Sequence, residues 1–463
     1  MTKTFKLNIV AVAIGTLFLT GCGDAETTII EKDPIEAPDD GHDHGDGDGF
    51  TIESMGRLAV LSAVSNEAAI YDLDKGYDLD KGDLLDSFSL IHDSNTLAFS
   101  ADYRFAVITN RTQDYVGFID GGLWRENHVD HLHDYKQGPV MSNYELSGSR
   151  PTHIITHDGQ LAVFFDGDAQ SGMPSSVQVV TDSDISSQTN SVPSLNYSIN
   201  MHGVAEPRDE YLFASVRRDD SESSSASKLL PDQIGVYHLH NGTYELEEVL
   251  AVTCPDLHGA AQNDDFVIFG CSDGAVVVHQ DDSTYQVNKV PNAEGLGNLR
   301  IGTIYGHEES SSFIGIAAGH GGGAAILLSV NPEESEMETL EWQPEAGADP
   351  VSYAFSYEGE HFLVLDSQGF LNILSHHEHD GHTHWELEKR LDISEEDIST
   401  MPEGMSFSMT VAQNGHYAYV SDPIAQHVLQ INLESLEITS DVELDFAPAN
   451  ITWLGIAEEA HSH

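Results

Sequence analysis

The feature that most constrains the fold is a short apolar strand that recurs along the chain at a spacing of 47 to 56 residues. A second strand follows each copy after a turn that contains Gly or Asp, and a weaker strand precedes most copies. This pattern at this period is typical of the blades of a β-propeller. The copies are LAVLSA from Leu58, FAVITN from Phe105, LAVFFD from Leu161, YLFASV from Tyr211, FVIFGC from Phe266, FIGIAA from Phe313, FLVLDS from Phe362 and YAYVSD from Tyr417.

The repeat predicts an all-β chain folded as a single β-propeller of eight blades, with seven blades as the alternative. The first copy lacks a good preceding strand, whereas PANITWLGIA at residues 448–457 has a strand pattern but no repeat of its own. We therefore expect the C-terminal strand to complete the first blade and close the ring. A sandwich or a barrel is disfavoured because neither requires a repeat of this length.

The N-terminal residues predict export. Lys3 and Lys6 precede an uncharged apolar run at residues 9–19, which ends in LTGC at Cys22. The run is too short for a stable membrane span, so residues 1–21 are predicted to be a cleaved signal peptide. The position of Cys22 matches the bacterial lipoprotein box and predicts lipidation there. A plain signal peptide with an incidental cysteine is the alternative.

Residues 22–50 are acidic, rich in Gly and poor in large apolar side chains, so we expect a flexible tether. The tether contains GHDHGDGDG, which includes His42 and His44, and residues 51–463 are predicted to form the propeller. The formal net charge of −58, with only 19 Lys and Arg residues, makes nucleic acid and anionic lipid surfaces unfavourable partners. The same charge suits a cation.

Three histidines occupy equivalent positions in consecutive repeats when the innermost strands are aligned by the turns that end them. They are His153, His202 and His258. Neighbouring blades direct equivalent residues to one axis, so the three imidazoles are expected to converge. Three imidazoles are the ligands that a Zn²⁺ site with one open position needs. A channel-lining or hydrogen-bonded core histidine is the alternative for each residue alone. The other repeats carry Leu97, Ile301, Tyr353 and Met409 at this position.

Loops expected at the same end of the ring carry further candidate ligands, among which Asp168 and His320 rank first. Acids in such turns usually cap the loop, and a carboxylate beside a ligating histidine can also orient its ring. The other acids considered are Asp166, Asp366 and Asp422.

Two histidine-rich stretches are expected on the opposite face, in insertions after the third strands of their blades. ENHVDHLHDY at residues 126–135 offers a second site with His128, His131 and His133, and HHEHDGHTH spans residues 376–384. Flexible histidine-rich loops bind metals weakly because each bond costs ordering entropy. We therefore expect the second stretch to be an accessory collector. Its histidines are His376, His377, His379, His382 and His384.

Cys254 and Cys271 remain when Cys22 is set aside. In an exported protein, two remaining cysteines favour a disulfide. Cys254 precedes the innermost strand of its repeat and Cys271 ends the adjacent strand, so both lie at one end of a sheet. A bridge there would hold His258 in place.

Several motifs together resemble the periplasmic zinc metallochaperones of the AztD family. They are GGLWRENHVDHLHDY, RPTHIITHDG, MHGVAEP, CPDLHGAAQNDDFVIFGCSDG and FLVLDSQG, in that order, and the likeness spans almost the whole mature chain. The resemblance implies a zinc-binding propeller that is not an enzyme and that hands zinc to the solute-binding protein of a zinc ABC importer. It also implies a flexible N-terminal His/Asp motif, matched by His42 and His44. A lipid anchor at Cys22 departs from a freely soluble periplasmic form.

Two other classes of function stay open. A lactonase-like enzyme or a quinone-cofactor dehydrogenase would also place its site in the channel, although the sequence has no nucleophile elbow, phosphate loop or convincingly paired carboxylates. A protein-binding propeller without catalysis is the third class. Metal content of untagged protein separates them: tight zinc favours the chaperone, calcium a lactonase and no metal a scaffold.

Overall fold

The computed structural model describes residues 50–458, apart from 75–82, 129–130, 219–228, 282–283, 298, 319–324, 343–346 and 380–381. The predicted signal peptide, Cys22, the tether with His42 and His44, and His320 lie outside the described residues. Strands dominate the described part, beside one short helix, α1 (Asp182–Ser187), and one 3-10 turn (Ile398–Thr400). Neither of these helical segments has the length and apolar character that a membrane span requires.

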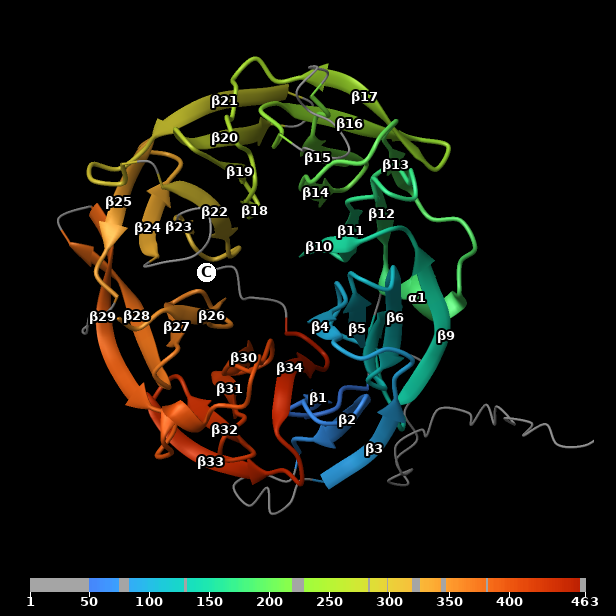
Figure 1. Cartoon of the computed structure of the whole chain (residues 1–463), viewed down its shortest axis with the longest axis vertical. Coiled ribbons are helices and arrows are strands. Elements are labelled where there is room, and N and C mark those ends of the chain that lie inside the picture. The colour runs from blue at the N-terminus through green and yellow to red at the C-terminus, as the bar shows by residue number, and fades with distance from the viewer. Residues whose placement is uncertain are drawn as a thin grey trace, which may run out of the picture.

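The sheets form a ring around a central axis, which Figure 1 shows in chain order from blue to red. Within the described residues, six sheets have four strands, one has eight and one has two. The first complete unit in the chain consists of β4 (Thr96–Phe99), β5 (Phe105–Asn110), β6 (Tyr115–Asp120) and β9 (Val140–Ser147). The two-stranded sheet, β7 (Leu123–Asn127) and β8 (Leu132–Lys136), is inserted between β6 and β9.

The eight-stranded sheet consists of two four-stranded halves. A single parallel residue pair, Ser194 with Thr243, joins the halves through β13 and β17. The first half contains β10 (Pro151–His157), β11 (Gln160–Phe165), β12 (Ser176–Val180) and β13 (Ser194–Asn196). The second half contains β14 (Ala205–Arg208), β15 (Tyr211–Ser215), β16 (Ile234–His240) and β17 (Thr243–Val249).

Four further four-stranded sheets follow in chain order. The first two contain β18 (Ala260–Gln262), β19 (Phe266–Cys271), β20 (Gly274–Asp281), β21 (Thr284–Pro291), then β22 (Arg300–Tyr305), β23 (Phe313–Ala318), β24 (Ile326–Asn331), β25 (Glu336–Leu340). The other two contain β26 (Pro350–Phe355), β27 (His361–Asp366), β28 (Phe370–His379), β29 (His382–Asp392), then β30 (Ser408–Val411), β31 (Tyr417–Asp422), β32 (His427–Asn432), β33 (Glu437–Glu443).

The last strand lies beside the first. In the remaining sheet, β34 (Pro448–Leu454) pairs antiparallel with β1 (Arg57–Ser62), which is followed by β2 (Glu67–Asp72) and β3 (Asp83–Ser89). Trp453 lies opposite Leu58, is 1% exposed, and its indole N–H donates to the Met55 carbonyl at 2.9 Å. The C-terminal segment 448–457, assigned from the sequence to the first blade, therefore contributes a strand to that sheet.

The recurring apolar strand is the second strand of each unit, where both of its faces are covered. All six residues of β5 are buried, because this strand packs against the neighbouring sheet as well as its own partners. One apolar cluster, for example, joins Phe105 and Phe118 to Val163 and Phe165 of the next unit. Outermost strands such as β9 and β33 have mostly exposed or partly covered residues, as expected at the rim.

Candidate metal centre

Three imidazoles converge from the inner edges of consecutive units, as the repeat alignment predicted. His153 lies on β10, His202 precedes β14 and His258 precedes β18. The Nε2 atom of His202 lies 3.4 Å from Nε2 of His153 and 2.9 Å from Nε2 of His258. Ligands of a tetrahedral zinc ion with bonds of about 2.0–2.1 Å lie roughly 3.3–3.4 Å apart. These two separations are therefore close to the spacing that a shared zinc ion requires, and all three ligand atoms lie within 4.8 Å of one another.

The opposite ring nitrogens of two of these histidines have fixed partners. Nδ1 of His202 lies 3.0 Å from Oδ2 of Asp166, a fully buried carboxylate that also accepts from Nη2 of Arg111 at 2.8 Å. Nδ1 of His258 lies 2.7 Å from the carbonyl oxygen of Gly302. Such partners hold the proton on Nδ1 and leave Nε2 with its lone pair directed at the site.

Burial keeps two of the rings neutral. Burial, followed by repulsion from the two neighbouring imidazoles, lowers the pKa of His153 from 6.5 to about 3. Burial is also the main cause that lowers the pKa of His258 to about 4. A neutral imidazole is the form that binds a metal ion, so both rings are ready to bind over the physiological pH range.

A disulfide joins Cys254 to Cys271. Both residues are fully buried, and the bond fixes the short segment that leads to His258 against β19. The backbone N–H of His258 donates to the Gly270 carbonyl at 3.2 Å, next to the bond. The disulfide predicted from the cysteine count is therefore present and lies directly behind one imidazole.

The acid that contacts the histidines is Asp166, although the sequence ranked Asp168 higher. Asp168 instead pairs with Nη2 of Arg150 at 2.9 Å and accepts from the Ser171 backbone at 2.8 Å. A signal existed in the repeat, because Asp166 directly follows a recurring strand, whereas Asp168 lies two residues further along the loop. Asp366 and Asp422 end the equivalent strands and accept from backbone N–H groups of Gln368 and Ile424, at 3.0 and 2.8 Å.

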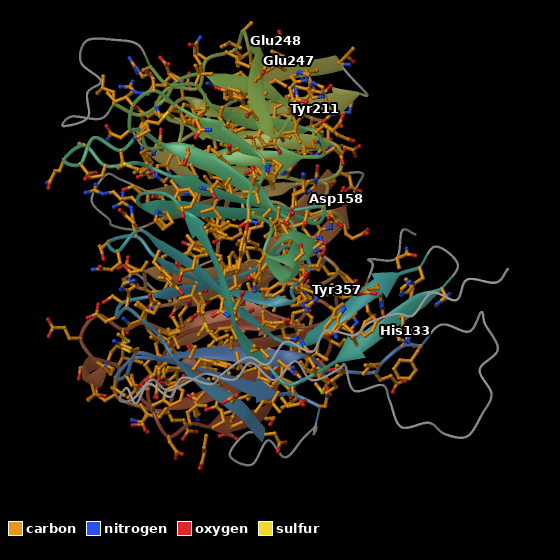
Figure 2. All side chains as sticks on the ribbon, turned by 90° about the vertical axis from the view of Figure 1, so that its right-hand side faces the viewer. His133, Asp158, Tyr211, Glu247, Glu248 and Tyr357 are labelled. Atoms are coloured by element: carbon orange, nitrogen blue, oxygen red, sulfur yellow. A yellow bond between two sulfur atoms is a disulfide. The ribbon has the colours of Figure 1, made fainter. Side chains whose placement is uncertain are left out.

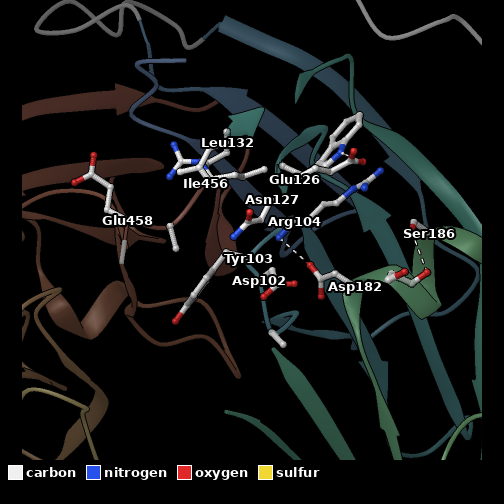
Figure 3. A pocket seen from close by; sticks show the side chains of 15 residues that line it. Asp102, Tyr103, Arg104, Glu126, Asn127, Leu132, Asp182, Ser186, Ile456 and Glu458 are labelled. Carbon is white, nitrogen blue, oxygen red and sulfur yellow. Dashed lines mark hydrogen bonds between the residues drawn. The ribbon is translucent and has the colours of Figure 1, made fainter. Parts of the chain in front are cut away.

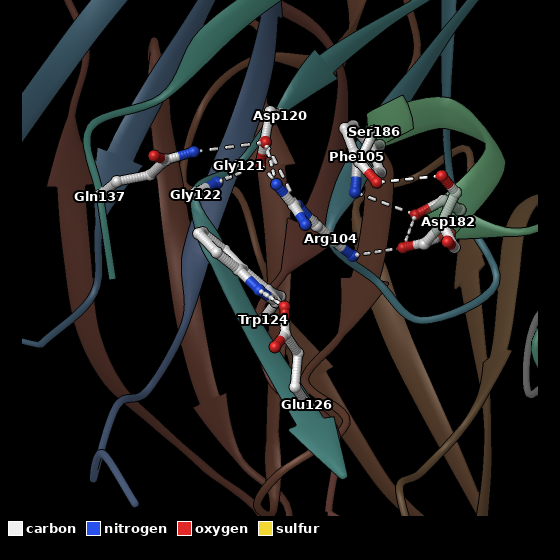
Figure 4. A network of polar contacts seen from close by, with 12 residues as sticks. Arg104, Phe105, Asp120, Gly121, Gly122, Trp124, Glu126, Gln137, Asp182 and Ser186 are labelled. Atoms are coloured by element: carbon white, nitrogen blue, oxygen red, sulfur yellow. Dashed lines mark hydrogen bonds and ion pairs between the residues drawn. The ribbon is translucent and has the colours of Figure 1, made fainter. Parts of the chain in front are cut away.

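The β7–β8 hairpin carries the histidines of the predicted second site on a fixed base. Arg104 lies at the centre of the polar contacts below the hairpin (Figure 4). Its Nη2 lies 2.6 Å from Oδ2 of Asp120, and its guanidinium carbon lies 3.9 Å from the ring centre of Trp124. Trp124 stacks on Tyr135 across the hairpin with ring centres 4.9 Å apart. These contacts anchor the hairpin at the end of β6.

The hairpin histidines are near one another without forming a compact ligand set. The ring of His128 lies 5.3 Å from that of His131 and 6.2 Å from that of His133. Among the described residues, His153, His202 and His258 have ligand atoms that all lie within 4.8 Å of one another; we call them the channel histidines. The three hairpin histidines do not form such a group.

The hairpin and the channel histidines lie toward opposite ends of the ring. A cavity of about 600 Å³ beside the hairpin is lined by Glu126 and Leu132 together with Asp102 and Tyr103, from the turn after β4 (Figure 3). This is the end at which innermost strands finish, whereas His153 is near the start of β10. Figure 2 shows the hairpin, with His133 labelled, projecting from the ring.

The stretch at residues 376–384 differs from the predicted loop. β28 continues through His379 and β29 begins at His382, so the histidines extend a β-hairpin. Cross-strand pairing accounts for this: His377 lies opposite His384 with ring centres 6.3 Å apart, and His376 packs 5.1 Å from the Trp385 ring. Both elements are consecutive in sequence, so this histidine group comes from one hairpin.

Comparisons with known proteins agree with the motifs. No protein-family model matches the chain. The zinc chaperone AztD of Citrobacter koseri is 24% identical over 363 residues, which cover 75% of each chain. A crystal structure of Citrobacter koseri AztD matches with a TM-score of 0.68 and 22% identity, over 88% of this chain and 98% of that one. The apo form matches equally well, at 21% identity over 87% and 98%.

A more distant structural match is dihydro-heme d1 dehydrogenase NirN, with a TM-score of 0.52 and 12% identity over 87% of this chain and 76% of that one. The AztD likenesses confirm the resemblance that the sequence predicted. The structural matches show that this chain shares the AztD fold.

Proposed function

We propose that this protein is a zinc metallochaperone that binds zinc at His153, His202 and His258 and passes it to the solute-binding protein of a zinc ABC importer. The observation that carries the proposal is the convergence of three Nε2 atoms from three separate units of the ring. The likeness to a zinc chaperone supports zinc as the cargo.

The ligand set suits a cargo that must be held tightly and still be released. Three imidazoles leave one zinc position open, where a ligand from a receiving protein can bind before the imidazoles leave one by one. Asp166 keeps the ring of His202 in its binding orientation. Because burial keeps His153 and His258 neutral, these two rings release no proton when zinc binds.

The ring itself is proposed to have eight blades, with the eight-stranded sheet counted as two. The support is the single residue pair that joins its halves, compared with the several pairs within each half. Closure by β34 beside β1 would make the ring continuous. A closed ring would hold the three histidines at fixed separations.

For the cellular location, we propose export to the periplasm, removal of residues 1–21 and lipidation of Cys22. The lipoprotein box supports the anchor, and the likeness to AztD supports the compartment. His42 and His44 in the tether and the histidines at 376–384 are proposed as accessory ligands for capture or delivery. His320 is proposed as an additional ligand beside the three central histidines, and the β7–β8 hairpin, with His128, His131 and His133, as a second site. The strongly negative charge disfavours nucleic acid as a partner.

Binding and transfer, rather than catalysis, is the proposed activity. A zinc ion with three histidine ligands can also activate water, so hydrolysis is the alternative outcome of a test. Zinc-loaded protein that hydrolyses lactones, with activity lost in His202→Ala, would favour an enzyme over a chaperone.

The direct test of the proposal is transfer in the presence of a trap. Zinc-loaded protein is mixed with the metal-free solute-binding protein of a zinc importer from the same cell, together with a chelator that captures free zinc. The proposal predicts that the partner gains zinc faster than the chelator does. Zinc that reaches the partner no faster than it dissociates into the chelator would contradict transfer, while leaving zinc binding intact.

A further inference from the structure

A second cluster of metal-ligating side chains lies away from the channel, on the β16–β17 hairpin. His238 and His240 lie on β16 and Glu247 lies on β17, and one ligand atom from each falls within a common span of 4.8 Å. The two histidines are two residues apart on one strand, so their side chains project from the same face. Figure 2 labels Glu247 on this part of the ring.

The hairpin geometry explains why Glu247 reaches the histidines. Asn241 and Gly242 both have positive φ, at 50° and 82°, as a two-residue turn between twisted strands requires. The register then shifts between Val236 and Tyr237, so β17 contains an extra residue there. That residue is Glu247, and a bulge of this kind redirects a side chain relative to the regular alternation.

Two of the separations between the ligand atoms match a metal site. Nδ1 of His238 lies 3.2 Å from Nε2 of His240 and 3.4 Å from Oε1 of Glu247. Zinc bonds of about 2.0–2.2 Å place neighbouring tetrahedral ligands roughly 3.3–3.5 Å apart. Two imidazoles with one carboxylate favour zinc or a similar transition metal, because Ca²⁺ and Mg²⁺ prefer oxygen ligands alone.

The ring of His238 is oriented for this role by its surroundings. Tyr211 lies opposite it on β15 and stacks on it, with ring centres 4.7 Å apart and planes at 21°. Its other nitrogen, Nε2, lies 3.6 Å from Oε2 of Glu210. This separation is longer than the 3.0 Å between His202 and Asp166, and the Glu210 side chain is 78% exposed, so the stack on Tyr211 is the firmer support of the His238 ring.

We propose that His238, His240 and Glu247 form a second binding site for Zn²⁺ or a similar divalent transition-metal ion. The site is open to solvent, since His240 is exposed and the Glu247 side chain is 47% exposed. Its ion therefore exchanges more readily than one held in the channel. Binding at this site does not depend on zinc transfer to a partner.

The test is a diffraction experiment at the zinc absorption edge on crystals of the mature protein soaked in millimolar zinc chloride. The expected result is an anomalous peak between the three ligand atoms, which disappears in His240→Ala. Glu245→Gln is the matched control, because Glu245 lies opposite His238 on β17 and is outside the ligand set. No peak in the unaltered protein, or a peak that persists in His240→Ala, overturns the proposal.

Solution binding provides the second measurement. Equilibrium dialysis against zinc should find one fewer exchangeable zinc ion per chain in His240→Ala than in Glu245→Gln. Glu247→Gln should weaken binding of this ion by at least about tenfold, the lower end of the range for changing an indirect partner of a metal site. Equal zinc stoichiometry and affinity in all three variants would overturn the proposal, whatever happens at the channel histidines.

Discussion

The channel histidines are held by separate sheets, whereas the histidines of the β28–β29 hairpin belong to a single hairpin. His202 is separated from its two channel neighbours by 49 and 56 residues, yet the three rings meet because separate sheets hold them. The histidines at 376–384 are neighbours in sequence and belong to one hairpin. Closeness of ligands in the sequence is therefore a different property from their preorganisation in space.

The physical reason is the entropy of ordering. A ligand already held in its binding geometry by a rigid scaffold loses little freedom when the metal binds. His202 and His258 also have fixed partners on Nδ1, Asp166 and the Gly302 carbonyl, so their rings need not reorient. The ring centres of His377 and His384 are 6.3 Å apart, so the two rings must move closer to each other before they can share an ion.

The largest effect should come from removing a channel ligand. His153→Ala should weaken tight zinc binding by at least about 100-fold, a loss above the scale of about 10–100-fold for indirect partners. Competition with a zinc chelator measures the change. His361→Ala is the control, since His361 is also a strand histidine but bonds only within its own sheet, to Ser375 at 2.8 Å. Similar losses of zinc affinity in both variants would show that His153 is not a specific zinc ligand.

A smaller effect should follow when the orienting carboxylate is changed. Asp166→Asn should weaken zinc binding by about 10–100-fold, because an amide orients the His202 ring less well than a carboxylate. Asp366→Asn is the matched control: Asp366 is equally buried and ends the equivalent strand, but caps a turn. Unchanged affinity in Asp166→Asn would show that the His202 ring is held by other means.

Removing the disulfide should lower the free energy of unfolding more than it changes zinc binding. The double variant Cys254→Ser, Cys271→Ser should lose about 3 kcal/mol of stability, the usual scale for a loop of this length. Zinc affinity should fall only several-fold, because His258 keeps its bond to Gly302. Urea denaturation and chelator competition measure the two quantities. Free thiols in the unfolded, unreduced parent protein would contradict the bond.

The smallest effect on zinc binding is expected from mild acid, because burial keeps His153 and His258 neutral; acid should act on stability instead. The pKa values of His153 and His258, about 3 and about 4, lie below the unfolded value of 6.5, so the unfolded chain binds more protons. Their contribution to stability is therefore present above pH 6.5 and is lost as the pH falls from 6.5 toward these values. The unfolding free energy of metal-free protein should drop by a few kcal/mol over this window.

The ring signals of both histidines, followed by NMR in metal-free protein, report the same pKa values directly. They should stay in the neutral form down to about pH 5. Titration of either ring near 6.5 would mean that burial does not keep the channel histidines neutral, and the contrast with a solvent-exposed imidazole would disappear.

The sequence was informative where one physical constraint acts repeatedly. Each recurring strand is buried on both faces, so its apolar run survives in every copy, and alignment by the following turn is enough to bring His153, His202 and His258 together. The disulfide was predictable for a similar reason, because only two cysteines were left to pair. Both predictions depend on topology and not on local detail.

The sequence did not predict which way individual side chains point or how single strands pair. Asp166 and Asp168 are two residues apart in one loop, and only the fold shows that the first faces His202 while the second faces Arg150. The histidines at 376–384 were expected in a loop. Their pairing as strands depends on how the two halves of the stretch meet, which local sequence does not reveal. The cluster with Glu247 was missed because it depends on a bulge in the register.

Two variants compared by competition with one zinc chelator test most directly which histidines hold zinc. In the first, His202→Ala removes one preorganised ligand, and in the second all five histidines between residues 376 and 384 become glutamine. We predict that the first variant weakens tight zinc binding by at least about 100-fold, while the second leaves it nearly unchanged. If the glutamine variant loses tight binding and His202→Ala retains it, the hairpin is the zinc site and the channel is not.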